Sequence, residues 1–485
     1  MAEQFCNIKQ NLTMLTDFYE LTMANGYFEN DFQNKIAYFD LFFRRVPDGG
    51  GFAIMAGVQQ IVEYLEHISF SEDDIAYLQS KKMFDKKFLQ YLKEFHFSCD
   101  VWAVPEGTPI FPGEPVVTVK GPVIEAQFIE TMLLLAINHQ SLIATKANRI
   151  VRAAKGKTVV EFGARRAQGF DGAIYGARAA YIGGCAGTSC TIAERDFGIP
   201  AMGTMAHSWI QLFDSELEAF RAYARQYPSD CMLLVDTYNT LKSGVVNAIK
   251  VFKEEVLPRG YRPAGIRIDS GDITYLSKKA RVMLDQAGLS DCKICASNSL
   301  DEHIIGDMLG QGAKVDMFGV GERLITSSSE PVFGGVYKLV AVEEGEKLIP
   351  KIKISENVSK ITTPGFKNLW RLFDRGTGKA IADVVTLFDE TIDDQNPYEI
   401  FDPEYIWKRK ILENFKAVPI RKQLFSKGMK CCTLPSIHKI REYCKEQVDS
   451  LWDEVTRFEN PHHYYVDLSE KLWDQKQKLI SQNKY

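Results

Sequence analysis

The sequence has few of the features that mark secreted, membrane-bound or nucleic-acid-binding proteins. Its 485 residues carry a net charge of −5, so the chain has no global basic field to attract nucleic acid. The longest apolar run, residues 132–137, is far too short to span a bilayer. Residues 1–7 lack the apolar core of a signal peptide. We therefore expect a cytoplasmic protein with no membrane and no nucleic-acid partner.

Histidine is scarce and cysteine is scattered. The chain has eight histidines and ten cysteines. The closest cysteine groups are residues 292 and 295 and residues 431 and 432, and neither has a second pair or nearby histidines at ligand spacing. This spacing favours reduced thiols over a zinc site.

The composition is that of an ordinary globular protein. Hydrophobic residues make up 45% of the chain and charged residues 25%. This length allows two or three domains, each with a buried core.

A strand-helix alternation extends from about residue 155 to 325 and predicts parallel strands joined by helices. The helical patterns include residues 215–227 and 274–287. The short apolar runs are residues 158–162, 180–183, 199–202, 232–235, 265–268, 293–296 and 315–319. About seven such units predict an irregular or incomplete α/β barrel rather than an open sheet.

The flanking regions have different patterns. Residues 1–150 mix helical and strand-like segments and predict an α+β domain, completed by the strand-rich residues 330–400. Residues 151–329 form the predicted barrel with the active site. Residues 401–485 are charged and aromatic, and we expect them to be largely helical.

Chemically active residues follow the predicted strands, where an α/β barrel places its active site. They are Arg165 and Arg166, Thr204 and His207, Asp236, Asp269 and Asp272, Ser297 and Asn298, and Gly319 to Gly321. Each has a structural alternative, because Asp, Ser, Asn and Gly after strands often form turns or cap helices. A single histidine is also more often structural than catalytic.

Arg267, Asp269 and Asp272 form the strongest of these groups. Strand alternation places Arg267 and Asp269 on one face, with Asp272 just beyond. One cation and two anions there could hold an anionic substrate, diol groups or magnesium. The alternative is an internal Arg–Asp ion pair.

Three further segments suggest contacts with a ligand. The loop from Gly319 to Gly321 lets backbone N–H groups approach a phosphate. Phe162 beside Arg165 could hold a flat heterocycle with an acidic group, although a core phenylalanine beside solvated arginines is equally compatible. Residues 16–23 open a helix with adjacent aromatic residues, for which core packing is the alternative.

In this order the motifs resemble the nicotinate phosphoribosyltransferase family. The resemblance covers about residues 10–375 and is most specific in Thr204-Met205-Ala206-His207-Ser208 and Arg267-Ile268-Asp269-Ser270-Gly271-Asp272. It implies a type II phosphoribosyltransferase fold and a homodimer with active sites at the subunit interface. It also implies a reaction in which nicotinate and phosphoribosyl pyrophosphate give nicotinate mononucleotide and pyrophosphate, with magnesium as cofactor and ATP hydrolysis coupled to turnover.

The resemblance also implies roles for individual residues. His207 matches the family's transiently phosphorylated histidine, and Tyr19, Thr204 and Arg267 match its nicotinate contacts. The chemistry of the residues themselves adds Phe162 to the expected nicotinate site. It also gives Asp269 an expected role in catalysis, and makes Asp269 and Asp272 the expected magnesium ligands. The expected contacts to phosphoribosyl pyrophosphate are Arg165, Asp272, Ser297, Asn298, Gly319, Gly321 and Glu322.

Two features bear on the alternatives. Glu322 stands where relatives often have threonine. A phosphate contact through the backbone N–H would tolerate this exchange, whereas a contact that needs a side-chain hydroxyl would not, because the carboxylate would repel the phosphate. A nicotinamide phosphoribosyltransferase is the nearest alternative, but residues 187–190, Gly-Thr-Ser-Cys, contain no acid of the kind that amide-specific relatives use there. Glu322 is also the best support for a non-catalytic phosphate-binding barrel.

Overall fold

The computed structural model describes residues 11–357 and 360–482, which form two compact units. Unit 1 is Ile143–Pro331, and unit 2 combines residues 11–142 with the described part of 332–482. The chain passes from unit 2 into unit 1 within helix α6, Glu130–Ala153. Residues 1–7, on which the expectation about a signal peptide depends, lie outside the described part. Every helix within it is too short or too polar to cross a lipid bilayer.

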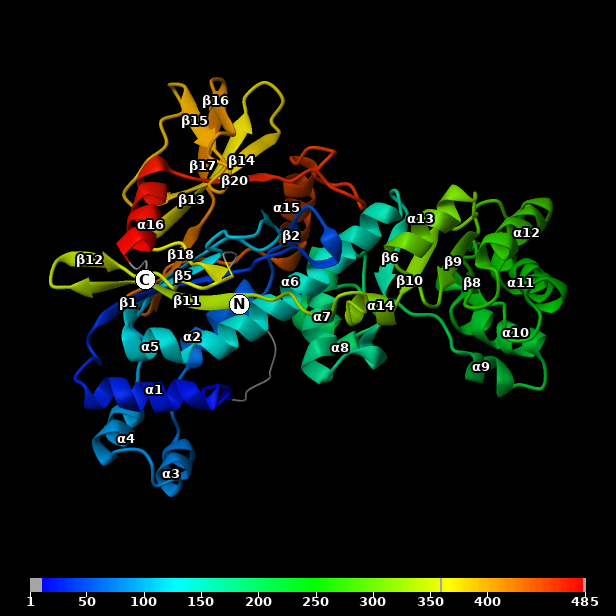
Figure 1. Cartoon of the computed structure of the whole chain (residues 1–485). Helices are drawn as coiled ribbons and strands as arrows, with labels where there is room; N and C mark the ends of the chain where they lie inside the picture. Colours follow the sequence, from blue (N-terminus) through cyan, green and yellow to red (C-terminus); the bar gives the residue numbers. More distant parts are fainter. Residues whose placement is uncertain (1–10, 358–359, 483–485) are drawn as a thin grey trace. The chain divides into compact units, whose positions relative to one another are not determined.

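Unit 1 is built on a five-stranded parallel sheet with the order β6-β10-β9-β8-β7 (Figure 1). Its strands are β6 (Thr158–Glu161), β7 (Met232–Leu234), β8 (Gly265–Ile268), β9 (Lys293–Ser297) and β10 (Met317–Val320). Nearly all of their residues are buried, as expected for parallel strands covered on both faces.

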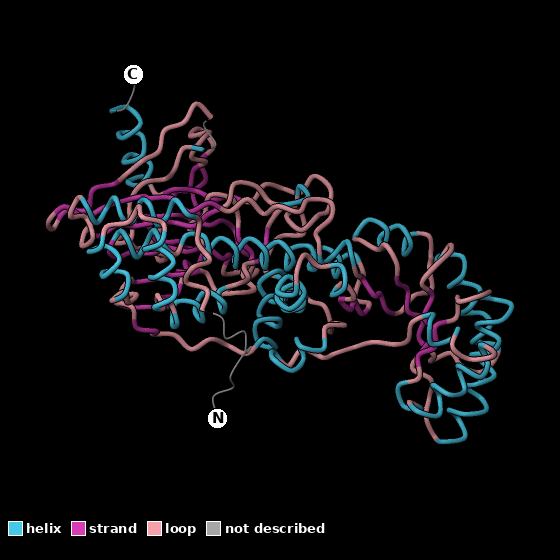
Figure 2. Tube along the Cα trace, turned by 90° about the horizontal axis from the view of Figure 1, so that it is seen from below, coloured by secondary structure: helices cyan, strands magenta, loops and turns pink. Residues whose placement is uncertain are grey.

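Helices connect these strands, and helix and strand segments alternate along the trace (Figure 2). They are α7 (Phe170–Ile182), α8 (Thr191–Phe197), α9 (His207–Gln211), α10 (Glu216–Gln226), α11 (Val245–Val251), α12 (Ile273–Gln286), α13 (Glu302–Gly310) and α14 (Glu322–Ile325). The α/β class predicted from the sequence is therefore confirmed.

The structure shows no closed barrel among the described residues. Strands β6 and β7 end the sheet, and two single-residue bridges extend it beyond β6, from Glu161 to Thr188 and from Thr188 to Ala201. Two strand predictions were wrong. Residues 180–182 complete α7 and Gly183 caps it, since the alanine-rich stretch 177–180 suits a helix, and residues 199–202 form only the bridge at Ala201.

Unit 2 contains mainly antiparallel sheets. The larger sheet has the order β12-β11-β1-β5-β3-β18-β19, and a second has the order β17-β13-β14-β20. Strands in the larger sheet are β1 (Ile36–Phe42), β3 (Asp100–Ala103), β5 (Val117–Pro122), β11 (Val336–Glu344), β12 (Lys347–Pro350), β18 (Lys422–Ser426) and β19 (Met429–Lys430). The second sheet contains β13 (Lys367–Asp374), β14 (Ala380–Leu387), β17 (Phe415–Pro419) and β20 (Tyr465–Leu468).

Two short strand pairs and several helices complete unit 2. The pairs are β2 (Ala53–Ile54) with β4 (Pro109–Ile110), and β15 (Tyr398–Phe401) with β16 (Arg409–Leu412). The helices are α1 (Phe18–Glu29), α2 (Val58–His67), α3 (Glu72–Ser80), α4 (Lys86–Lys93), α5 (Val123–Phe128), α15 (Ile437–Asp449) and α16 (Glu470–Gln482).

Residues 401–485 differ from the expected largely helical region. The described part holds helices α15 and α16 but also strands β16 to β20. Strand β17 pairs with β13, and β18 pairs with the distant β3. These strands depend on partners remote in sequence, which local charge and aromatic content do not reveal.

Candidate active site

Arg267 lies at the centre of a polar network at the carboxyl edge of the unit 1 sheet. Its Nη2 donates to Asp269 Oδ1 at 2.8 Å, and its Nε donates to Ser297 Oγ at 2.8 Å. Its Nη1 donates to Thr204 Oγ1 at 3.1 Å and to the Met205 carbonyl at 3.4 Å. Of the five N–H groups of the guanidinium, one remains for a ligand. The ion pair given above as the structural alternative and the predicted ligand-binding group are therefore formed by the same residues, Arg267 and Asp269.

Asp269 is held in its ionised form. Burial raises the pKa of its carboxyl, but the Ser297 hydroxyl and the Arg267 charge outweigh burial and hold the pKa below its ordinary value. Both of these partners contact Oδ1. Oδ2 faces His207, whose Nε2 lies 3.8 Å away. Because Asp269 stays charged and one of its oxygens has no hydrogen bond within the described chain, it can stabilise positive charge on a ligand.

His207 begins the short helix α9 and is 39% exposed. Its Nδ1 lies 3.1 Å from the Thr237 hydroxyl, so both ring nitrogens face a polar group. Thr237 follows strand β7 and was not among the residues predicted from the sequence. The imidazole is thus oriented by two neighbouring strands and open to solvent, which suits a group that reacts with a bound ligand.

Phe162 forms an aromatic wall beside this network. The Arg267 guanidinium lies 5.7 Å from the centre of its ring, within the range of a cation–π contact. A Cβ atom on Gly319 would lie 2.4 Å from this ring. Gly319 is therefore required by the position of Phe162, a packing reason that the sequence analysis did not consider.

Glu161 fixes the loop that carries Phe162. Its buried carboxylate accepts hydrogen bonds from Thr188 Oγ1 at 2.6 Å and from the Gly163 backbone N–H. Burial raises the pKa of Glu161, and these hydrogen bonds partly offset the increase. Glu161 is therefore a positioning residue that was not predicted from the sequence. The sequence feature that could have indicated it is an acidic residue within a buried strand.

Ion pairs join the loops that follow β6, β10 and β9. Arg166 Nε lies 3.6 Å from Glu322 Oε2, and Arg323 pairs with Asp301. Arg165, beside Arg166, is exposed. The charged residues around Gly321 thus face one another across neighbouring strands of the sheet.

The remaining predicted phosphate contacts have local structural roles. Asp272 caps α12, because its Oδ1 accepts the Tyr275 N–H at 2.9 Å. This is the helix-capping role given above as the structural alternative to ligand binding. Asn298 and Ser299 have φ values of 87° and 51°, in the left-handed region that most residues avoid. Such a conformation commonly marks a functional loop.

Carboxylate oxygens near Asp269 are suited to a hydrated cation. Asp236 Oδ2 accepts the Asp269 N–H at 3.0 Å and the Ser270 hydroxyl at 2.5 Å, while its buried Oδ1 has no partner in the described structure. No group of three acidic, histidine or cysteine side chains converges on one point within the described residues. Magnesium commonly binds through one or two carboxylates with substrate phosphates and waters, and this donor set fits that mode.

Tyr19 belongs to unit 2, unlike the other predicted site residues. It is 44% exposed and lines a cavity of about 340 Å³ with Tyr27, Glu130 and Lys338, among others. Burial, and then the Glu130 charge, raises the pKa of its hydroxyl. Lys338 Nζ lies 3.6 Å from Glu130. An aromatic wall with one cation and one anion is thus available in this cavity.

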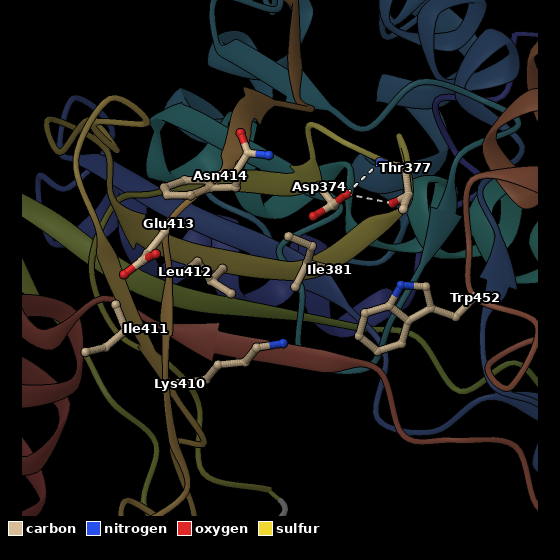
Figure 3. Close-up of a pocket in the computed structure, with 10 residues that line it drawn as sticks. Asp374, Thr377, Ile381, Lys410, Ile411, Leu412, Glu413, Asn414 and Trp452 are labelled. Atoms are coloured by element: carbon tan, nitrogen blue, oxygen red, sulfur yellow. Dashed lines mark hydrogen bonds between the residues drawn. The ribbon is translucent and has the colours of Figure 1, made fainter.

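A second cavity of unit 2, of about 370 Å³, contains none of the predicted site residues (Figure 3). Lys410 extends toward the space between Ile381 and Trp452, and Asp374 accepts two hydrogen bonds from Thr377. Asp374 and Thr377 therefore contribute to a turn at the wall of this cavity.

The structure brings together Phe162, Thr204, Arg267, Asp269 and Ser297 through direct contacts, with His207 beside Asp269. The other predicted residues of unit 1 lie at the same carboxyl edge, after β6, β8, β9 and β10, except that Gly319 lies within β10 and not in the predicted loop.

Comparison with known proteins points to one family. Models of the nicotinate phosphoribosyltransferase N-terminal domain, family and C-terminal domain match residues 14–138, 158–373 and 366–476. The chain is 43% identical over 474 residues to the nicotinate phosphoribosyltransferase of Bacillus subtilis, covering 98% of this chain and 96% of that protein. It is 35% identical to the Dictyostelium discoideum nicotinate phosphoribosyltransferase, covering 95% of this chain and 87% of that one.

A solved structure agrees. The crystal structure of human nicotinic acid phosphoribosyltransferase superposes with a TM-score of 0.83 at 29% identity, covering 96% of this chain and 100% of the human chain. With matches along almost its whole length, this chain belongs to the nicotinate phosphoribosyltransferase family.

Proposed function

We propose that this protein joins nicotinate to phosphoribosyl pyrophosphate, giving nicotinate mononucleotide and pyrophosphate with coupled ATP hydrolysis, in NAD salvage. The observation that carries this proposal is the Arg267 guanidinium beside the Phe162 ring, with Thr204 hydrogen-bonded to it. A flat ring with a carboxylate is complementary to an aromatic face and a cation. The neutral amide of nicotinamide would make weaker use of Arg267.

Nicotinate binds with its ring against Phe162 and its carboxylate near Thr204 and Arg267. Tyr19, which belongs to unit 2, is proposed as a nicotinate contact from the family resemblance alone. The ring nitrogen is already a nucleophile, so orientation matters more than a general base.

The reaction forms a bond from the nicotinate nitrogen to the anomeric carbon and breaks the bond from that carbon to pyrophosphate. Positive charge develops on the ribose. Asp269 stabilises it because its carboxylate is ionised and its Oδ2 is free of hydrogen bonds.

Phosphoribosyl pyrophosphate is held along the carboxyl edge of the sheet. The proposed contacts are Arg165, Asp272, Ser297, Asn298, Gly319, Gly321 and Glu322. Backbone N–H groups of the glycine loop and the Arg165 side chain suit phosphate oxygens, while carboxylates suit ribose hydroxyls.

Asp269 and Asp272, assisted by Asp236, would hold magnesium together with the pyrophosphate oxygens. Magnesium supplies charge neutralisation of the departing pyrophosphate. The unpartnered Asp236 Oδ1 supports this assignment.

His207 accepts the γ-phosphoryl group of ATP on its imidazole. A nitrogen–phosphorus bond forms, the bond to the ADP oxygen breaks, and water later cleaves the phosphoramidate to release phosphate. The added negative charge reorganises the contacts around Asp269 and couples ATP cleavage to synthesis.

The finer architecture also belongs to this proposal. The bridges at Thr188 and Ala201 support an incomplete barrel that continues the sheet beyond β6. We also propose a cytoplasmic homodimer with active sites at the subunit interface. The proposed domains are residues 1–150 together with 330–400, residues 151–329, and residues 401–485.

A substrate comparison tests the proposed reaction. Pyrophosphate release from phosphoribosyl pyrophosphate should require nicotinate, increase with ATP, and be far slower with nicotinamide. Arg267→Gln should reduce the preference for nicotinate because it removes the cation that faces the carboxylate. A clear preference of the wild type for nicotinamide would contradict the proposal.

Labelling tests the role of His207. The protein incubated with γ-labelled ATP should acquire an acid-labile label, and His207→Ala should not. His67, exposed on α2, provides the matched control, because His67→Ala should be labelled like the wild type. Equal labelling of His207→Ala and the wild type would refute a phosphohistidine at this position.

A further inference from the structure

Glu322 begins helix α14 after β10, and Arg166 ends the short 3-10 helix Ala164–Arg166 after β6; these two segments contact each other directly. Strands β6 and β10 are neighbours in the parallel sheet, so the loops after them meet at one edge. The Phe162 N–H donates to the Val320 carbonyl at 2.7 Å. A Cβ on Gly163 would lie 2.7 Å from the Gly321 carbonyl oxygen. The two side chains therefore extend from a tightly packed backbone.

The two side chains form an exposed ion pair. Arg166 Nε lies 3.6 Å from Glu322 Oε2, and the side chains are 60% and 62% exposed. The neighbouring Arg323 is paired with Asp301 instead. Arg166 is thus the charged partner of Glu322 within the described residues, and the pair can be reached from solvent.

This geometry gives Arg166 two competing anions. An exposed carboxylate at 3.6 Å is a weak partner for a guanidinium, whereas a phosphate carries more charge and binds the fork in a bidentate manner. Once Arg166 turns to the phosphate, Glu322 becomes an unpaired carboxylate close to another anion. It then weakens phosphate binding instead of supporting it.

We propose that Glu322 limits the affinity for the phosphate-bearing substrate by competing with it for Arg166. In the free protein its carboxylate holds the guanidinium. On binding, the substrate phosphate displaces it, and the released carboxylate limits affinity and favours release of phosphate-bearing product. This inference rests on the proposed function, because it takes phosphoribosyl pyrophosphate as the ligand of this edge.

The test is Glu322→Gln, which keeps the shape and removes the charge. The KM for phosphoribosyl pyrophosphate should fall about 3- to 10-fold without an increase in kcat, and pyrophosphate measured by calorimetry should bind more tightly by a similar factor. In 0.5 M salt both differences should shrink, because exposed charges are screened. In the Arg166→Gln background, Glu322→Gln should lower KM by a smaller factor than in the wild type, because the competition for Arg166 is gone and only direct repulsion of the phosphate remains.

Asp291→Asn is the matched control. Asp291 also forms an exposed ion pair, with Arg262, but it precedes β9 and so lies at the opposite end of the parallel strands. This variant should leave KM and pyrophosphate binding unchanged. An unchanged or increased KM in Glu322→Gln, or an equal shift in Asp291→Asn, would overturn the proposal.

The two proposals fail in different ways. A wild-type protein without nicotinate-dependent pyrophosphate release would contradict the proposed function. Calorimetric titration of the same variants with pyrophosphate would still decide whether Glu322 opposes phosphate binding.

Discussion

Each unit contains an arginine–aspartate pair that also binds a hydroxyl, but the two pairs differ in access to solvent. In unit 2, Arg371 and Asp383 are completely buried, and both carboxylate oxygens bind the guanidinium, at 2.8 and 2.6 Å. In unit 1, Arg267 and Asp269 are 15% and 29% exposed, and the guanidinium contacts only Oδ1. A buried pair in which both carboxylate oxygens bind the guanidinium fixes the fold, whereas a pair with a free oxygen and solvent access can bind a ligand.

The largest effect should come from breaking the buried pair. Arg371→Met leaves Asp383 charged and unpaired in the core, which should lower the free energy of unfolding by about 3–5 kcal/mol. Urea unfolding measures this change. Arg409→Met is the control, because its pair with Glu399 is about half exposed and should contribute at most about 1 kcal/mol. Similar losses in both variants would contradict the distinction between the pairs.

At the open pair, Arg267 and Asp269 of unit 1, we expect a large effect on activity and a small effect on stability. Asp269→Asn removes the charge that stabilises the ribose, and kcat/KM should fall about 100- to 1000-fold. The free energy of unfolding should change by less than about 1 kcal/mol, because the pair is partly solvated. Steady-state kinetics and urea unfolding measure the two effects. Asp285→Asn, at a carboxylate that is 50% exposed and paired with Arg281, should alter neither, and a large stability loss in Asp269→Asn would assign that residue to the fold.

A smaller effect is expected at Ser297, which contacts both members of the open pair. Ser297→Ala removes a hydrogen bond to a charged group and should lower kcat/KM about 10-fold. Ser277→Ala, at a buried serine on α12, is a control for loss of a hydroxyl and should leave kcat/KM unchanged at temperatures where it is folded. Unchanged activity in Ser297→Ala would show that Arg267 and Asp269 position each other without it.

The smallest effect concerns a buried acid that has no cation. Glu20 in unit 2 accepts hydrogen bonds from Thr16 and Thr131, and burial raises its pKa from 4.5 to about 7. The folded state therefore holds a proton that the unfolded chain releases, so the free energy of unfolding should fall as pH increases from about 4.5 to 7. Thermal unfolding from pH 5 to 8 should show a shallower decrease in Glu20→Gln than in the wild type.

Glu72→Gln is the control for Glu20, because Glu72 is largely exposed on α3. It should keep the wild-type pH dependence. If Glu20→Gln kept it as well, another group would be responsible.

Much of the unit 1 sheet could be predicted from the sequence. Five apolar runs, including residues 158–162 and 265–268, are strands, because buried parallel strands are continuous apolar segments. The run at 180–183 was wrongly predicted as a strand, and it ends a helix. Four apolar residues are too few to show whether hydrophobicity repeats with the period of a strand or of a helix.

The site was partly predictable for a similar reason. Arg267 and Asp269 alternate on one strand, so their proximity follows from local geometry. The contacts of Thr237 with His207 and of Thr188 with Glu161 join segments 30 and 27 residues apart, and only the folded chain brings them together. The prediction that Gly319 belongs to a phosphate loop likewise did not include its packing against the ring of Phe162. Phe162 follows the neighbouring strand, β6, and the fold brings the two residues together.

The close packing of Phe162 on Gly319 also constrains how this site can change. A side chain at position 319 has no room while the ring is present, so substitutions there succeed only together with a smaller residue at position 162. The two positions should therefore vary as a pair in any library made to accept new ring substrates. A search that randomises position 319 alone would return the wild-type glycine.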